Sequence, residues 1–255
     1  MDPYLLIGTV RPERAALDVQ DTFEFAHFAL ATRGLARVRI VKNQIAVWVE
    51  TEHAYAVNDL RNLVQNMVQD LLAAVTYVHG SSYEVEITRV ICTERGVDYV
   101  FGVDTPCIAA RVPPDAQNVR ALAIRARTAG AEGIYVSRAM VDLSLALKHA
   151  NDTGFYCYRA IESLRQHCAA VNGLGTDESG RAEAWAKFRA TAACGEAAIG
   201  FIASAAKVVR HGGLAFLTDA DRAALLTKTW DIVDGYLAGI ATDPGVEPAK
   251  TQKEG

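Results

Sequence analysis

The chain has 255 residues and a formal net charge of −4, with 51% hydrophobic and 22% charged residues. This is the composition of ordinary globular protein, with enough apolar material for one large domain or two small ones. The acidic balance argues against wholesale coating of nucleic acid and against a polybasic membrane tether, and it still permits a local basic patch.

Targeting and redox features predict a soluble cytoplasmic protein without a membrane partner. The first residues, Met1-Asp2-Pro3, lack a basic region, and the apolar run Tyr4–Val10 is too short for the core of a signal peptide. No run of about 18 apolar residues is present, so no membrane span is expected. The cysteines are odd in number and form no CxxC pair, which predicts reduced thiols. They stand at positions 92, 107, 157, 168 and 194.

Residues 1–115 have the pattern of an α+β domain. Charged and apolar side chains alternate along Arg37–Ile40, and the same period continues over 45–49 after an expected hairpin loop at 42–44. Further strands are expected at Tyr4–Val10, Thr22–Leu30, Glu84–Ile87 and Val97–Val103. An alternating pattern predicts a mostly antiparallel sheet with one buried face.

One main helix is expected among these strands, over about 56–79. Apolar residues recur there every three or four positions: Val57, Leu60, Val64, Met67, Leu71, Val75 and Val78. Asn58 or Asp59 is expected to cap its start, and Gly80 to end it. The N-terminal unit is thus predicted to be a sheet packed by a single helix.

Residues 116–132 are interpreted as a connector. Prolines 106, 113 and 114 precede it, and proline disrupts regular elements. A short helix over Asn118–Thr128 would carry three arginines, and no acidic residue lies between Asp115 and Glu132. Two interpretations stay open: a solvated connector, which we favour, or a strip that contacts phosphate.

Residues 133–241 are expected to be helical throughout. Four apolar stripes with helical spacing run over Val136–Ala150, Cys157–Val171, Phe188–Val209 and Leu226–Ile240. Four amphipathic helices with short connections predict a bundle. Thr218 is expected to cap the last helix, while Gly195 and Gly200 would allow close helix approach. The polar tail 242–255 is expected to be disordered.

The second stripe carries a row of charged residues. Arg159, Glu162 and Arg165 are spaced by three, so they are neighbours on a helix surface. We favour a row of ion pairs over a functional row, and we keep both interpretations open. Cys157 and Cys168 lie on the apolar stripe and are expected in the core.

His211 is the best single candidate for chemistry. Histidine exchanges a proton near neutral pH, and the adjacent Arg210 could hold a phosphate or a developing negative charge. Gly212 and Gly213 follow, so the helix is expected to end there and leave the site open. A histidine that merely stabilises a helix C-terminus explains the pattern equally well.

The region 133–241 resembles HEPN-type four-helix domains. The resemblance rests on the segment Tyr158-Arg159-Ala160-Ile161-Glu162 in the second helix and on a histidine followed by glycine late in the third. It implies a four-helix fold, a link to RNA or bacterial defence, and a homodimer formed through the C-terminal helices. Active members carry an arginine, then four to six intervening residues, then the histidine. Here Ser204, Ala205 and Ala206 occupy those positions, and the nearby bases are Lys207 and Arg210.

Two classes of function follow from these residues. The preferred one is a non-catalytic binding or dimerisation protein, with Arg159, Glu162, Arg165 and Lys207 as binding residues and with RNA or a protein as partner. The alternative is a metal-independent ribonuclease that uses His211 with Arg210 or Lys207. Motifs for nucleotide, zinc-protease and hydrolase sites are missing and the six histidines show no tight metal spacing, so no cofactor is expected.

Overall fold

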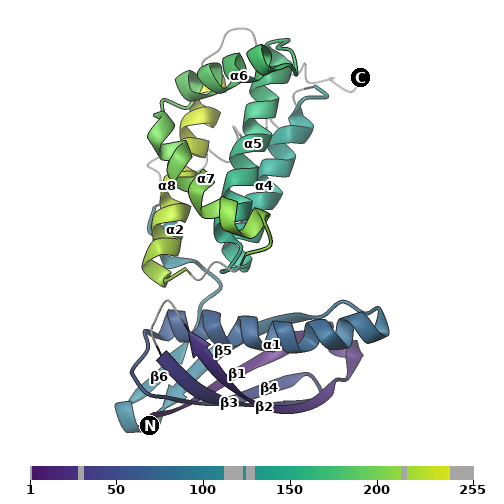
Figure 1. The fold of residues 1–255 in the computed structure, drawn as a ribbon, viewed down its shortest axis with the longest axis vertical. Coiled ribbons are helices and arrows are strands. Elements are labelled where there is room, and N and C mark those ends of the chain that lie inside the picture. Colours follow the sequence, from purple (N-terminus) through teal and green to yellow (C-terminus); the bar gives the residue numbers. More distant parts are fainter. Residues whose placement is uncertain (1, 28–31, 112–122, 125–129, 214–216, 242–255) are drawn as a thin grey trace, which may run out of the picture. The chain divides into compact units, whose positions relative to one another are not determined.

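The computed structural model describes residues 2–27, 32–111, 123–124, 130–213 and 217–241. The chain forms two compact units, Met1–Val103 and Asp104–Gly255 (Figure 1). The predicted disordered tail lies outside the described residues, and so does most of the predicted connector. An antiparallel sheet with one helix in the first unit and helices in the second confirm the α+β fold class.

The first unit contains a six-stranded sheet in which every pairing is antiparallel. Its strands are β1 Asp2–Arg11, β2 Asp18–His27, β3 Thr32–Val41, β4 Gln44–Thr51, β5 Glu84–Cys92 and β6 Val97–Val100, with short 3-10 turns η1 Glu13–Ala15 and η2 Thr93–Arg95. They lie in the order β2-β3-β4-β1-β5-β6. The first strand of the chain is therefore an inner strand, between β4 and β5.

The β3–β4 hairpin turns at Lys42 and Asn43, which both have positive φ, as the tight turn of a two-residue hairpin requires. The buried Asn43 side chain accepts the N–H of Leu17 at 2.5 Å and donates to the carbonyls of Val10 and Pro12 at 3.3 and 2.9 Å. Asparagine tolerates this backbone and hydrogen-bonds locally. The turn residue thus fixes the segment that joins β1 to β2.

Helix α1, Val57–His79, covers one face of the sheet and confirms the predicted helix over about 56–79 (Figure 1). Its buried residues Leu60, Val64, Val68 and Leu72 join a core with the inward side chains of the strands. Gly80 ends it in the left-handed region, as predicted. The predicted cap is wrong: the helix begins at Val57, so Ala56, two residues before Asn58, occupies the N-cap without a side-chain bond.

The second unit consists of helices in its described part. They are α2 Pro106–Ala109, α4 Gly133–Lys148, α5 Thr153–Val171, α6 Glu178–Thr191, α7 Glu196–Arg210 and α8 Asp219–Ala241. The stripe over Phe188–Val209, predicted as one helix, belongs to two, because Ala193 has a φ of 50° and the chain bends by 114° between α6 and α7. The predicted cap at Thr218 is confirmed by a bond from the Asp221 N–H to its hydroxyl at 3.1 Å.

Glycines set the closest helix contacts, although at other positions than expected. A Cβ on Gly239 or Gly235 of α8 would lie 2.3 or 2.4 Å from a backbone oxygen at the end of α6. A Cβ on Gly154 would lie 2.9 Å from that of Ala205, where α5 crosses α7. Gly195 and Gly200, the predicted sites of close approach, face open space.

Within the described part of the chain, no single helix is long and apolar enough to cross a membrane. Only the sharply bent pair α6 and α7 reaches that length and composition, and only when the two helices are taken together.

Candidate functional site at the crossing of α5 and α7

Three side chains share one face of α5. Tyr158, Glu162 and Arg165 are spaced by four and three residues, which places them one above another on a helix. The adjacent stripe of α5, with Cys157, Ile161, Leu164 and Cys168, is fully buried in the core, as predicted for the two cysteines. Burial of the apolar stripe therefore fixes the direction in which the polar face points.

Arg165 is held by an aromatic ring. Arg165 is only 8% exposed, and its guanidinium lies 5.3 Å from the centre of the Trp185 ring on α6. Within the described residues it makes no hydrogen bond or ion pair. Its nitrogens are not among the buried side-chain atoms that lack a partner, so the guanidinium keeps access to solvent and its N–H donors stay available to a ligand.

A second arginine reaches the same face from α7. The guanidinium of Arg210 lies 5.9 Å from the centre of the Tyr158 ring, which is a cation–π contact at the outer limit of its range. Lys207 precedes it by one helical turn and is exposed. We refer to Tyr158, Glu162, Arg165, Trp185 and Arg210 as the α5–α7 cluster.

The pKa of the Tyr158 hydroxyl reflects the charges of this cluster. Burial raises the pKa most, and the nearby Glu162 carboxylate raises it further. Arg210 and Arg165 both oppose this rise, because a positive charge favours the phenolate. The tyrosine therefore lies within electrostatic range of both guanidinium groups, and it stays a neutral hydrogen-bond donor at physiological pH.

Arg159 does not join the cluster. It binds the carboxylate of Asp142 on α4 through two guanidinium nitrogens, one of them at 2.9 Å, and lies over the rings of Phe155 and Tyr156 at 5.2 and 5.1 Å. Asp142 is 1% exposed. The favoured interpretation of an Arg159–Glu162–Arg165 ion-pair row is wrong, because the carboxylate that Arg159 binds comes from another helix.

His211 lies just beyond the last turn of α7, as the C-cap residue. It is exposed, and its backbone N–H donates to the Val208 carbonyl at 3.2 Å. Among the described residues, no hydrogen bond or ring contact of its imidazole is found. The predicted pair is thus split: Arg210 contributes to the cluster, while none of the described residues orients the ring of His211.

Several residues that shape this domain were missed by sequence reasoning. Trp185 holds Arg165, Asp142 binds Arg159, and Arg222 on α8 is buried and donates to the hydroxyl of Thr153 at 3.0 Å. The sequence could have indicated a special role for Asp142, because this residue interrupts the apolar stripe of its helix. It could not have indicated the role of Arg222, because the partners of Arg222 come from elements far away in the sequence. No group of side chains suited to a metal occurs among the described residues, and all five cysteines are free thiols.

Comparison with known proteins adds two domain assignments. DUF8168 is a family of unknown function with an N-terminal and a C-terminal domain. Residues 4–101 match the model of the first domain, and residues 121–241 match the model of the second. The chain contains both DUF8168 domains. The two matches fall on the two compact units. Neither the curated proteins nor the solved structures gave a significant match.

Proposed function

We propose that the C-terminal DUF8168 domain is a non-catalytic binding module that holds RNA by its phosphates at the α5–α7 cluster. The observation that carries this proposal is the pair of arginines near Tyr158. Arg165 and Arg210 come from different helices, and aromatic rings rather than carboxylates hold them. Guanidinium groups with unused donors bind phosphate oxygens in a bidentate manner.

Charge distribution supports placing the polyanion in this half of the chain. Residues 1–115 hold 10 Lys and Arg against 15 Asp and Glu, whereas residues 116–255 hold 16 against 15. The exposed Lys207 adds a third cation beside Arg210. Glu162 is the one carboxylate of the cluster, and it limits how many phosphates the site tolerates, because it repels them.

The absence of catalysis is part of the proposal and rests on His211. A general base needs a ring held within hydrogen-bond reach of the proton it removes. The His211 imidazole is exposed and no described residue orients it, and the arginine that the HEPN pattern requires is replaced at Ser204, Ala205 and Ala206. We likewise propose, from its sequence resemblance, that this domain is HEPN-like.

Fluorescence polarisation with a labelled single-stranded RNA of about 20 nucleotides tests the proposal in the full chain. Arg210→Ala and Arg165→Met are expected to weaken binding, the latter keeping an apolar stem against Trp185. Each lost phosphate contact should lower the slope of log affinity against log salt by about 0.7. Arg138→Ala on α4 is the matched control, since Arg138 is also an exposed cation of this unit.

Two results would contradict the proposal. The first is affinity that is equal for wild type, Arg165→Met and Arg210→Ala while Arg138→Ala weakens it. The second is cleavage of the RNA in the presence of EDTA that disappears in His211→Ala, because this would establish the metal-independent ribonuclease.

A further inference from the structure

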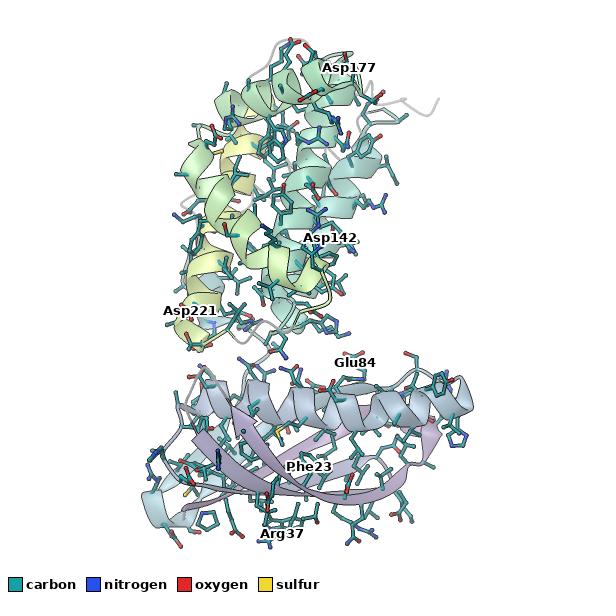
Figure 2. The ribbon with its side chains drawn as sticks, viewed as in Figure 1. Phe23, Arg37, Glu84, Asp142, Asp177 and Asp221 are labelled. Carbon is teal, nitrogen blue, oxygen red and sulfur yellow. The ribbon has the colours of Figure 1, made fainter. Side chains whose placement is uncertain are left out.

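One face of the N-terminal sheet is left uncovered by the described residues of its unit. α1 packs on the other face, where Tyr4, Leu6, Val47 and Val49 are buried. The alternate residues point away from α1, and Figure 2 shows Arg37 on this side. We call it the open face. Trp48 is its most prominent member, 43% exposed on the third strand of six.

A single row of residues crosses the open face at Trp48. Strand pairing puts Thr22 beside Arg37, Arg37 beside Trp48, Trp48 beside Leu5, Leu5 beside Ile91, and Ile91 beside Asp98. The row therefore has an apolar centre of Trp48, Leu5 and Ile91. A cation lies on its β3 side and an anion on its β6 side.

Arginines on the open face are paired with carboxylates. Arg37 binds Glu50, Arg89 donates to both oxygens of Asp98 at 2.7 and 2.5 Å, and Arg39 lies 3.3 Å from Asp18. A polyanion would meet as many carboxylates as guanidinium groups here. An apolar centre with a charge-balanced polar rim is instead the anatomy of a protein interface, and an exposed tryptophan at the centre is its usual anchor.

We propose that the open face binds the open face of a second copy of this chain. A two-fold axis parallel to the strands, centred on β1, reverses the strand order of the partner. It then lays Leu5 on the partner's Leu5 and Trp48 on the partner's Ile91, and it brings Arg37 next to the partner's Asp98. Such an interface is isologous, so each contact occurs twice. The row is complementary to its own reversal, which favours a second copy over an unrelated protein.

The size of the face is sufficient for a specific dimer. Strands lie about 4.8 Å apart and rise about 3.3 Å per residue, so the four inner strands over eight residues span about 500 Å². Two copies bury about 1,000 Å², which is the lower limit for a stable interface. A two-fold pairing of sheets through interdigitated side chains is the common geometry of a β-sandwich.

Light scattering after size exclusion and sedimentation velocity, at about 1–100 µM full-length protein, test this dimer. The wild type is expected to be a dimer at the upper end, and Trp48→Asp should weaken it at least about 30-fold, as for a hot-spot residue. Tyr77→Asp is the control, because Tyr77 is 91% exposed at the end of α1, away from the open face. Circular dichroism must show the same fold for both variants.

A mixing experiment tests the axis itself. Arg37→Glu and Asp98→Lys should each weaken the dimer, because each puts like charges together at both symmetric contacts. Mixing the two variants should restore a heterodimer, since both contacts then join opposite charges while the changes inside each chain stay the same. A wild type that is monomeric at about 100 µM overturns the proposal. It is also overturned if Phe201→Asp on α7 abolishes a dimer that Trp48→Asp leaves intact.

Discussion

The imidazole Nδ1 of His167 and the hydroxyl of Tyr236 lie 2.8 Å apart inside the helical unit. The two residues are 5% and 0% exposed, and their rings meet edge to face. Burial lowers the pKa of His167 and raises that of Tyr236, so both groups are neutral in the folded protein. The bond joins α5 to α8, which are distant in the sequence.

This pair predicts how stability depends on pH. The folded-state pKa of His167 is lowered below its ordinary value of 6.5, so the unfolded chain takes up the proton first as the pH falls. The stability that the folded chain gains from keeping His167 neutral is fully present above about pH 6.5 and is lost as the pH falls below that value. The melting temperature should drop between pH 7 and pH 5, and His167→Gln should flatten that drop. His211→Gln, which changes an exposed histidine, should leave it unchanged.

Tyr236→Phe is expected to lower the free energy of unfolding by about 1–3 kcal/mol, because it leaves a buried nitrogen of His167 without a partner. Urea unfolding followed by circular dichroism measures this change. A free energy equal to that of the wild type would mean that the bond adds nothing to stability.

Two glycine-to-alanine changes are expected to shift the free energy of unfolding in opposite directions. Gly239→Ala puts a Cβ against the Thr191 carbonyl at 2.3 Å and should destabilise the domain by about 1–3 kcal/mol, as overpacking does. Gly200→Ala faces open space within a helix and should stabilise it by up to about 1 kcal/mol. The same urea titration compares the two, and a loss in Gly200→Ala would show that this position is covered by something outside the described residues.

His211→Ala is expected to change the free energy of unfolding by no more than about 0.5 kcal/mol, the usual range for an exposed side chain. Thermal unfolding measures it. A large loss would support the role left open from the sequence, in which the imidazole stabilises the end of α7.

Removing Arg159 should destabilise the fold more than removing its partner. Arg159→Ala leaves the carboxylate of Asp142 buried and uncompensated, whereas Asp142→Asn leaves a guanidinium that is 41% exposed and can be solvated. The double variant should be more stable than the sum of the single changes implies, because its buried side chain carries no charge. Additive losses would show that the two groups act independently.

The fold was largely predictable because periodicity reports directly on burial. The alternation around Arg37–Ile40 predicted the sheet, and the apolar stripe from Val57 to Val78 predicted α1. The break at Ala193 was not predictable, because an alanine with positive φ carries no sequence signal and is imposed by packing. For the same reason, the glycines that approach a backbone could not be told from those that face solvent.

The candidate site was predictable only in part. Helical spacing placed Glu162 and Arg165 on one face, and it also placed Arg159 near them. Which arginine finds a carboxylate depends on Asp142, and which finds a ring depends on Trp185, and both partners come from other helices. Contacts between helices depend on crossing geometry, which a single sequence does not reveal.

The inner position of β1 has a consequence for the order of synthesis. The ribosome makes this strand first, but its neighbours β4 and β5 start at residues 44 and 84. The β2–β3–β4 meander can form from local contacts while β1 still waits for both partners, and non-local strand pairing is slow. Deleting β1 would not trim an edge: it would remove the strand that connects the meander to β5 and β6.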